Sequence, residues 1–192
     1  MIDSKIEPWN SWAKVQAQRT KSADVGSYDK LSFYFLWDNP YDYYMLVNAY
    51  SSLVVKGVGV ATGNTGFLSG GYGSLFATAH IEYFEPAGDP PDSVQGTETK
   101  LIFDLQAQGG GFWSMETGQA DSKAVFATYN VRDDWIPIHP RARAVFEVSL
   151  SLKYTIFGNG EVHYDFANNV FDYFVQCPSM LLTLLSPTPQ MM

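Results

Sequence analysis

LSFYFLWDNPYDYYMLVNAYSSLVVKGVGVA, residues 31–61, is the longest apolar and aromatic run in the chain. It breaks at Asp38, Asn39 and Pro40, because proline removes a backbone donor and asparagine and aspartate favour turns. Large apolar side chains occupy both faces of residues 31–37, which predicts a central strand. Residues 43–61 are too rich in β-branched, aromatic and glycine residues for a helix. We therefore expect one long strand there, bent near residues 51–52 or Gly57.

The remaining chain continues this pattern of short apolar segments separated by turns. Glycine-rich residues 62–73 and 109–121 and proline-containing residues 86–98 and 132–141 predict loops, and Gly158-Asn159-Gly160 predicts a tight hairpin. In the cleanest alternating segment, residues 99–108, Asp104 should face water. Further strands are expected at residues 74–85, 99–108, 122–131, 142–157, 161–166, 171–177 and 181–185.

About eight strands in 192 residues, of which 46% are hydrophobic, predict an all-β domain with one core. The simplest arrangement is an antiparallel β-sandwich of jelly-roll type, with a closed barrel as the second choice. Residues 31–185 form this domain. Residues 1–30 are interpreted as an arm, in which Trp9, Trp12 and Ala13 have the spacing of a short amphipathic helix over residues 8–18. Residues 186–192 are a proline-containing tail, and we expect the arm or the tail to pack on the domain or on another subunit.

Charge and cysteine content exclude several classes of function. A formal net charge of −8 argues against a nucleic-acid partner and makes attachment to anionic membranes unfavourable. No segment has the roughly 18 uninterrupted apolar residues of a membrane-spanning helix. The single cysteine, Cys177, excludes an internal disulfide framework, and no signal peptide follows Met1. These features predict a cytoplasmic protein and leave export without a cleaved signal open.

The chain lacks a recognisable catalytic or metal-binding motif. His80 with Glu82, and Glu161 with His163 and Asp165, have the two-residue spacing of ligands on one strand face, but metal sites need three or more convergent ligands. We expect these side chains to be ordinary polar positions. Cys177 lies in an apolar strand before a proline, which predicts a buried thiol with a raised pKa and not a nucleophile. There is no G-x-S-x-G motif, so we expect a protein that is not an enzyme.

Regular alternation of antiparallel strands predicts which loops share an end of the sandwich. Residues 37–39, 86–98, 132–141 and 168–169 would share one end, and residues 62–73, 109–121 and 158–160 the other. The first end combines an aromatic plane with carboxylates and amides, which is the mixture that binds sugars. We therefore predict a lectin-like module that binds a carbohydrate or small ligand. The candidate ligand-binding residues are Trp37, Asp38, Asn39, Asp133, Asp134, Trp135 and His139.

No cofactor is expected, although the clustered acids at this end are of the type that holds Ca²⁺. The competing structural interpretation is that these residues form Asx-turns and that Trp135 closes one end of the core. The alternative function is a self-assembling structural subunit, a homo-oligomer or filament with the arm and the loops as contacts.

Overall fold

The computed structural model describes residues 2–5, 11–20, 23–66, 70–85, 98–111 and 117–185. These residues form eleven strands and no helix. In chain order the strands are β1 Ile2–Lys5, β2 Ser11–Arg19, β3 Ala23–Asp38, β4 Met45–Gly63, β5 Tyr72–Phe84, β6 Lys100–Gln108, β7 Gln119–Ile138, β8 Arg143–Phe157, β9 Gly160–Phe166, β10 Phe174–Cys177 and β11 Met180–Leu185.

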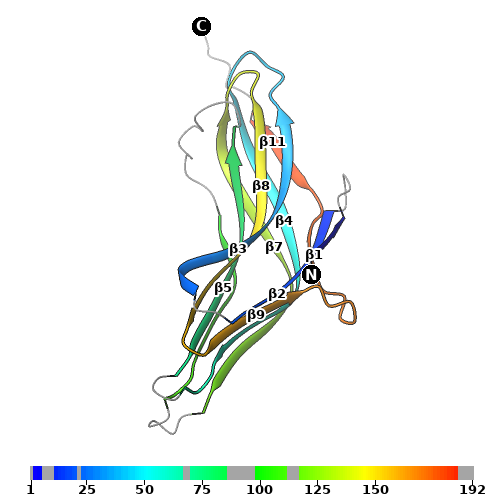
Figure 1. Ribbon diagram of the computed structural model, residues 1–192. Coiled ribbons are helices and arrows are strands. Elements are labelled where there is room, and N and C mark those ends of the chain that lie inside the picture. The colour runs from blue at the N-terminus through cyan, green and yellow to red at the C-terminus, as the bar shows by residue number, and fades with distance from the viewer. Residues whose placement is uncertain are drawn as a thin grey trace.

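The strands form two antiparallel sheets, of seven and four strands, which confirms the predicted all-β sandwich (Figure 1). In the larger sheet, β4 pairs with β7 on one side and with β11, β10 and β9 in succession on the other. β2 pairs with β9 and β10, and β1 pairs with β2. The smaller sheet has the order β3-β8-β5-β6. We call these the seven-stranded and the four-stranded sheet.

β4 confirms the prediction of one long strand, and its side chains alternate between buried and half-buried over all 19 residues. The inward positions, including Val47, Leu53 and Val55, are completely buried against the four-stranded sheet. Gly57 also points inward, where an added Cβ would lie 2.2 Å from a ring carbon of Phe166. Glycine at this position therefore makes room for a large core side chain.

Two predictions about the first part of the chain are wrong. Residues 11–19 form the strand β2 and not part of a helix, because pairing with β1, β9 and β10 overrides the helical spacing of Trp12 and Ala13. The arm thus contributes strands to the sandwich, and β3 already begins at Ala23. β3 is an edge strand, since it pairs only with β8 among the described strands. Its outward side chains Tyr34 and Leu36 are 56% and 64% exposed, so the aromatic pattern does not reflect burial of both faces.

The predicted loop at residues 132–141 is also wrong in most of its length, because β7 continues to Ile138. Pro137 is tolerated since β7 pairs only with β4 among the described strands, and a proline at a sheet edge loses no ladder hydrogen bond on its open side. Within residues 132–141 the pairing of β7 with β4 is nevertheless irregular. The register shifts between the pair Ala49 and Asp133 and the pair Val47 and Ile136.

The grouping of loops at the two ends is partly confirmed. Main-chain bonds from Asn39 to Ala142 (2.9 Å) and from Arg141 to Tyr41 (3.0 Å) join the β3–β4 and β7–β8 connections, at the top of Figure 1. At the other end, Gly109 donates to Gly71 (2.8 Å), which joins the connections that begin after β6 and after β4.

The connection at residues 167–173 belongs to neither end, contrary to the prediction for residues 168–169. It lies beside the middle of β4, between the β9 pairing at Val58 and the β10 pairing at Lys56. Trp9 and residues 86–97 and 186–192 lie outside the described residues.

Candidate functional site

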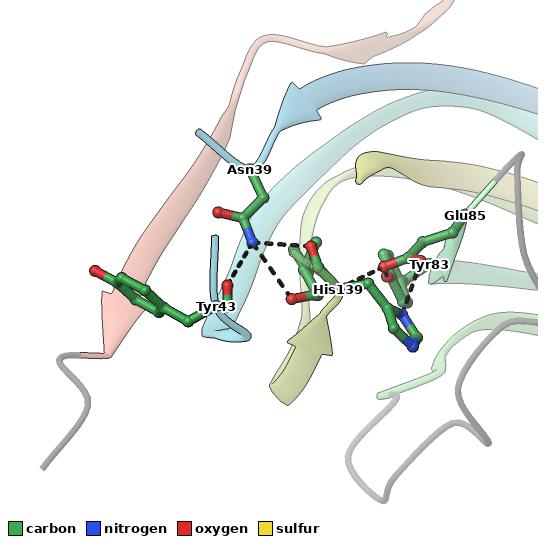
Figure 2. Close-up of polar contacts among 6 residues, drawn as sticks. Asn39, Tyr43, Tyr83, Glu85 and His139 are labelled. Carbon is green, nitrogen blue, oxygen red and sulfur yellow. Dashed lines mark hydrogen bonds and ion pairs between the residues drawn. The ribbon is translucent and has the colours of Figure 1, made fainter. Parts of the chain in front are cut away.

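Asn39 holds the loop that follows β3. It is 2% exposed, and its amide nitrogen donates to the main-chain carbonyls of Tyr43 (3.0 Å) and His139 (2.9 Å). Its Oδ1 accepts the N–H of Tyr41 at 3.0 Å, as in an Asx-turn. Figure 2 shows the amide nitrogen of Asn39 between these two carbonyls. The polar groups of Asn39 are thus engaged by the main chain, as the competing structural interpretation expects.

His139 ties the end of β7 to the end of β5 through Glu85, whose side chain is only 5% exposed. The His139 main-chain N–H donates to Glu85 Oε1 (3.0 Å), and the ring Nδ1 donates to Oε2 (2.9 Å). The Tyr83 hydroxyl also donates to Glu85 Oε1, and burial together with this bond raises the pKa of Tyr83 well above its ordinary value. Figure 2 shows the three side chains converging. The cluster is a link between the two sheets, with the imidazole orientation fixed by a carboxylate.

Three tyrosines extend from the loop that Asn39 holds. Tyr41, Tyr43 and Tyr44 are 40%, 47% and 57% exposed, and the rings of Tyr41 and Tyr43 stack with centroids 5.1 Å apart. Tyr44 packs on His139 at 4.8 Å between ring centroids. We did not predict these as site residues, because Tyr43 and Tyr44 were assigned to the following strand. The available signal was a tyrosine-rich segment directly after an Asp-Asn-Pro turn.

Trp37 and Asp38 point to opposite faces of β3, so they do not face the same site. Trp37 is half-buried and packs against the core. Asp38 is exposed on the outer face of the four-stranded sheet, where Arg143 binds it with two hydrogen bonds of 2.7 and 3.0 Å. The bond to Arg143 lowers the pKa of Asp38.

Trp135 lies on a β-bulge of the edge strand β7. Asp134 and Trp135 together face the single residue Asn48 of β4. Trp135 has φ = 63°, a left-handed main-chain conformation that is unusual for a residue with a bulky side chain. The residue is 56% exposed to solvent. The Asn48 side chain stabilises this geometry, because its Oδ1 accepts the Trp135 N–H at 2.9 Å and its Nδ2 donates to the Tyr50 hydroxyl at 3.3 Å.

Asp133 and Asp134 point to opposite faces of the same strand. Asp133 is 6% exposed, and burial, followed by the charge of Asp134, raises its pKa to about 6. Asp134 Oδ2 lies 3.6 Å from Arg132 Nε, whereas its buried Oδ1 has no hydrogen-bond partner among the described residues. Arg132 Nε also lies 3.7 Å from Glu98 Oε2.

A groove of about 400 Å³ lies on the outer face of the seven-stranded sheet next to this bulge. Tyr50 connects the two features, since it lines the groove and contacts Asn48, and Arg132 connects the groove to Asp134. The lining residues are Tyr50, Ser51, Ser52, Glu98, Asn130, Val131, Arg132, Ser179 and Leu181. We call Trp135, Asp134 and Asn48 together with this groove the Trp135 surface.

The seven residues predicted from the sequence therefore divide into separate groups. Asn39 and His139 are brought together at the end of the sandwich, as part of the scaffold. Asp134 and Trp135 share the Trp135 surface, while Asp133 points inward beneath them. Sequence reasoning missed Asn48, Tyr50 and Arg132, whose common face appears only once β4 and β7 are paired.

Metal-binding geometry is not found in the described part of the chain, where no three His, Cys, Asp or Glu side chains are grouped to hold an ion. His80 lies on β5 and His163 on β9, in different sheets. Cys177 is buried, and burial raises its pKa to about 11, as predicted for a buried thiol.

No protein-family model matches this chain, and no curated protein sequence matches it significantly. Across the described residues there is no helix with the length and hydrophobicity needed to cross a bilayer. The function is therefore inferred from the geometry of the chain itself.

Proposed function

We propose that this protein is a non-catalytic module that binds a neutral glycan on the Trp135 surface. The observation that carries the proposal is the indole of Trp135, which is 56% exposed on a residue with φ = 63°. Strained conformations persist where the surrounding structure imposes them, and they cluster at ligand-binding sites. Here Asn48 and the bulge hold the ring outward, and an exposed aromatic plane is what covers the apolar face of a sugar ring.

Polar groups beside the ring match the hydroxyls of a sugar. Asp134 contributes a carboxylate next to the bulge, with Oδ2 3.6 Å from Arg132 Nε. The groove adds the hydroxyl of Tyr50, the amide of Asn130 and the guanidinium of Arg132. Together they provide both donors and acceptors along one face of the sheet.

The charges of the groove favour a neutral glycan over an acidic one. Arg132 lies between Asp134 and Glu98, at 3.6 and 3.7 Å, so its positive charge is already balanced by two carboxylates. A sialylated or uronic-acid glycan would bring a further negative charge next to these acids, and like charges repel.

A glycan array carrying neutral and acidic glycans tests the proposal. The wild-type protein should bind neutral structures, and Trp135→Ala should lose the signal. The matched control is Tyr34→Ala, because Tyr34 is equally exposed, at 56%, but lies on the four-stranded sheet. Binding that survives Trp135→Ala, or that is lost equally in both variants, would contradict the proposal.

A second candidate function, self-assembly, is favoured by an apolar patch on the side of the molecule. Phe126, Val170 and Phe171 are 62%, 86% and 62% exposed, and the rings of Phe126 and Phe171 both contact Tyr173. Patches of this kind occur at subunit contacts. Light scattering should then show an oligomer that Phe171→Ser dissociates, whereas a wild-type monomer at high micromolar concentration would contradict assembly.

A further inference from the structure

A second polar depression, of about 310 Å³, lies on the outer face of the four-stranded sheet. The outward side chains of three adjacent strands meet there, since Ser149 of β8 pairs with Ser32 of β3 and with His80 of β5. The lining residues are Tyr28, Lys30, Thr78, His80, Thr99, Ser149, Ser151 and Lys153, and we call this depression the β8 pocket. It is separate from the Trp135 surface, which lies on the other sheet.

Ser149 carries a buried hydroxyl without a partner among the described residues at the floor of the β8 pocket. Outward positions on a sandwich are normally hydrated, yet Ser149 is 1% exposed and its Oγ has no hydrogen-bond partner among the described residues. A buried hydroxyl without a partner is destabilising, because it has lost its hydrogen bonds to water. Thr78, also buried at 8% exposure, lies on the neighbouring strand. A ligand oxygen in the pocket satisfies such a group.

Among the described residues, the charged groups around the pocket leave Lys153 without an ion pair. Lys30 Nζ lies 2.6 Å from Glu147 Oε1 and 3.4 Å from Glu82 Oε2, so its charge is balanced. Lys153 forms no ion pair with any described residue. His80 donates or accepts through Nδ1 at 3.0 Å from Thr99 Oγ1, and burial, as the largest cause, lowers its pKa. Because Lys153 has no ion pair within the described residues and Glu82 and Glu147 lie nearby, a ligand with a single negative charge fits the pocket better than a doubly charged one.

We propose that the β8 pocket binds a small organic carboxylate, which accepts hydrogen bonds from the Ser149 and Ser151 hydroxyls and pairs with Lys153. Hydroxyls and an ammonium are donors that a carboxylate accepts. The ring of Tyr28, which is 61% exposed at the edge of the pocket, can cover an apolar part of the same molecule. This site is independent of glycan binding, so either proposal can fail without the other.

The test is an NMR titration of the wild-type protein with sodium acetate and sodium benzoate at pH 7 and constant ionic strength. The main-chain amide signals of Ser149 and His80 should shift and saturate with both carboxylates, and not with sodium chloride or glucose. Lys153→Gln should weaken binding about tenfold, because a hydrogen bond to a charged group is lost. The matched control is Lys56→Gln, on the other sheet, which should bind like the wild type.

Ser149→Ala separates binding from folding. It should weaken carboxylate binding without lowering the melting temperature, because the removed hydroxyl has no partner among the described residues. The proposal is overturned if neither carboxylate gives saturable shifts, if glucose or phosphate binds as tightly, or if Lys153→Gln and Ser149→Ala both bind normally.

Discussion

The two ends of the sandwich are held together differently. At the end where β4 leads to β5, main chain packs directly on main chain, whereas at the end where β3 leads to β4, buried polar side chains also hold the loops. Gly71 donates to Asn64, and Gly109 donates to Gly71, in direct main-chain bonds of 2.7 and 2.8 Å. At the other end main-chain bonds also join the loops, but the buried side chains of Asn39 and of the His139–Glu85 pair add to them. The first end therefore depends on glycines that let main chains approach closely, and the second on buried polar side chains that bind the loops.

This difference explains where binding groups are found. A close main-chain contact leaves no space for functional side chains, but loops held by a few buried polar groups leave neighbouring positions free for exposed aromatics. The Trp135 bulge and the tyrosines after Asn39 both occur at the side-chain end. The predictions below test the two ends against each other, from the largest expected effect to the smallest.

Gly160→Ala should destabilise the protein by about 2–4 kcal/mol, because overpacking of this kind forces the main chain apart. The added Cβ would lie 2.0 Å from the carbonyl oxygen of Tyr72. Gly118→Ala is the matched control, since the nearest contact of its added Cβ with the described residues beyond its chain neighbours is 3.1 Å, to the carbonyl oxygen of Gly63. Urea unfolding should separate the two variants, and equal stabilities would show that the glycine end is not closely packed.

Asn39→Ala should cost about 2–3 kcal/mol at the opposite end, because it leaves buried main-chain groups without partners. Asn168→Ala provides the comparison, since Asn168 makes an exposed Asx-turn bond of 2.9 Å to Val170. The melting temperature should fall clearly for the first variant and little for the second. Equal losses would mean that Asn39 does not hold the end together.

Asp133→Asn should stabilise the protein at pH 7.5 by about 1–2 kcal/mol after allowance for solvent screening. The folded pKa is about 6, above the ordinary 3.8, so the folded state favours the neutral acid and loses stability as the pH rises through this window. The advantage of the variant should disappear near pH 4. Thermal unfolding across this pH range measures it, and an advantage that does not depend on pH would contradict the cause given.

At position 135, glycine should be more stable than alanine by about 1 kcal/mol, because only glycine adopts a positive φ without steric cost. The order should reverse at Phe126, an exposed residue on the same strand without a positive φ. Unfolding of Trp135→Gly, Trp135→Ala, Phe126→Gly and Phe126→Ala gives both differences. The ordinary preference for alanine at both positions would show that Trp135 is not strained.

Local patterns were sufficient to predict the fold class, the long strand β4 and the tight turn at Gly158, because alternation and turn chemistry are properties of neighbouring residues. The predicted hairpin at this turn is wrong, since β8 lies in the four-stranded sheet and β9 in the seven-stranded sheet. Local patterns failed where the secondary structure depends on pairing with distant strands. β2 is a strand through pairing with residues more than a hundred positions away, and Pro137 fits a strand only because β7 is at an edge.

The candidate site was predictable only in part for the same reason. Trp135 and Asp134 stand next to each other in the sequence, so the pattern identified them. Asn48 and Tyr50 come from β4, and only the register with β7 places them on the same face. Asp133 continues the inward alternation of Val131, and the bulge that follows turns Ile136, and not Trp135, to the inward face.

The most direct test of glycan binding is the indole N–H signal of Trp135 in an NMR titration with cellobiose, lactose and maltose in turn. Loss of one indole signal in Trp135→Gly identifies it among the five tryptophans. We predict that this signal shifts with at least one of these neutral disaccharides, while the indole of the core-packed Trp37 stays unchanged. An unchanged Trp135 indole signal at saturating concentrations of all three sugars would contradict binding on the Trp135 surface.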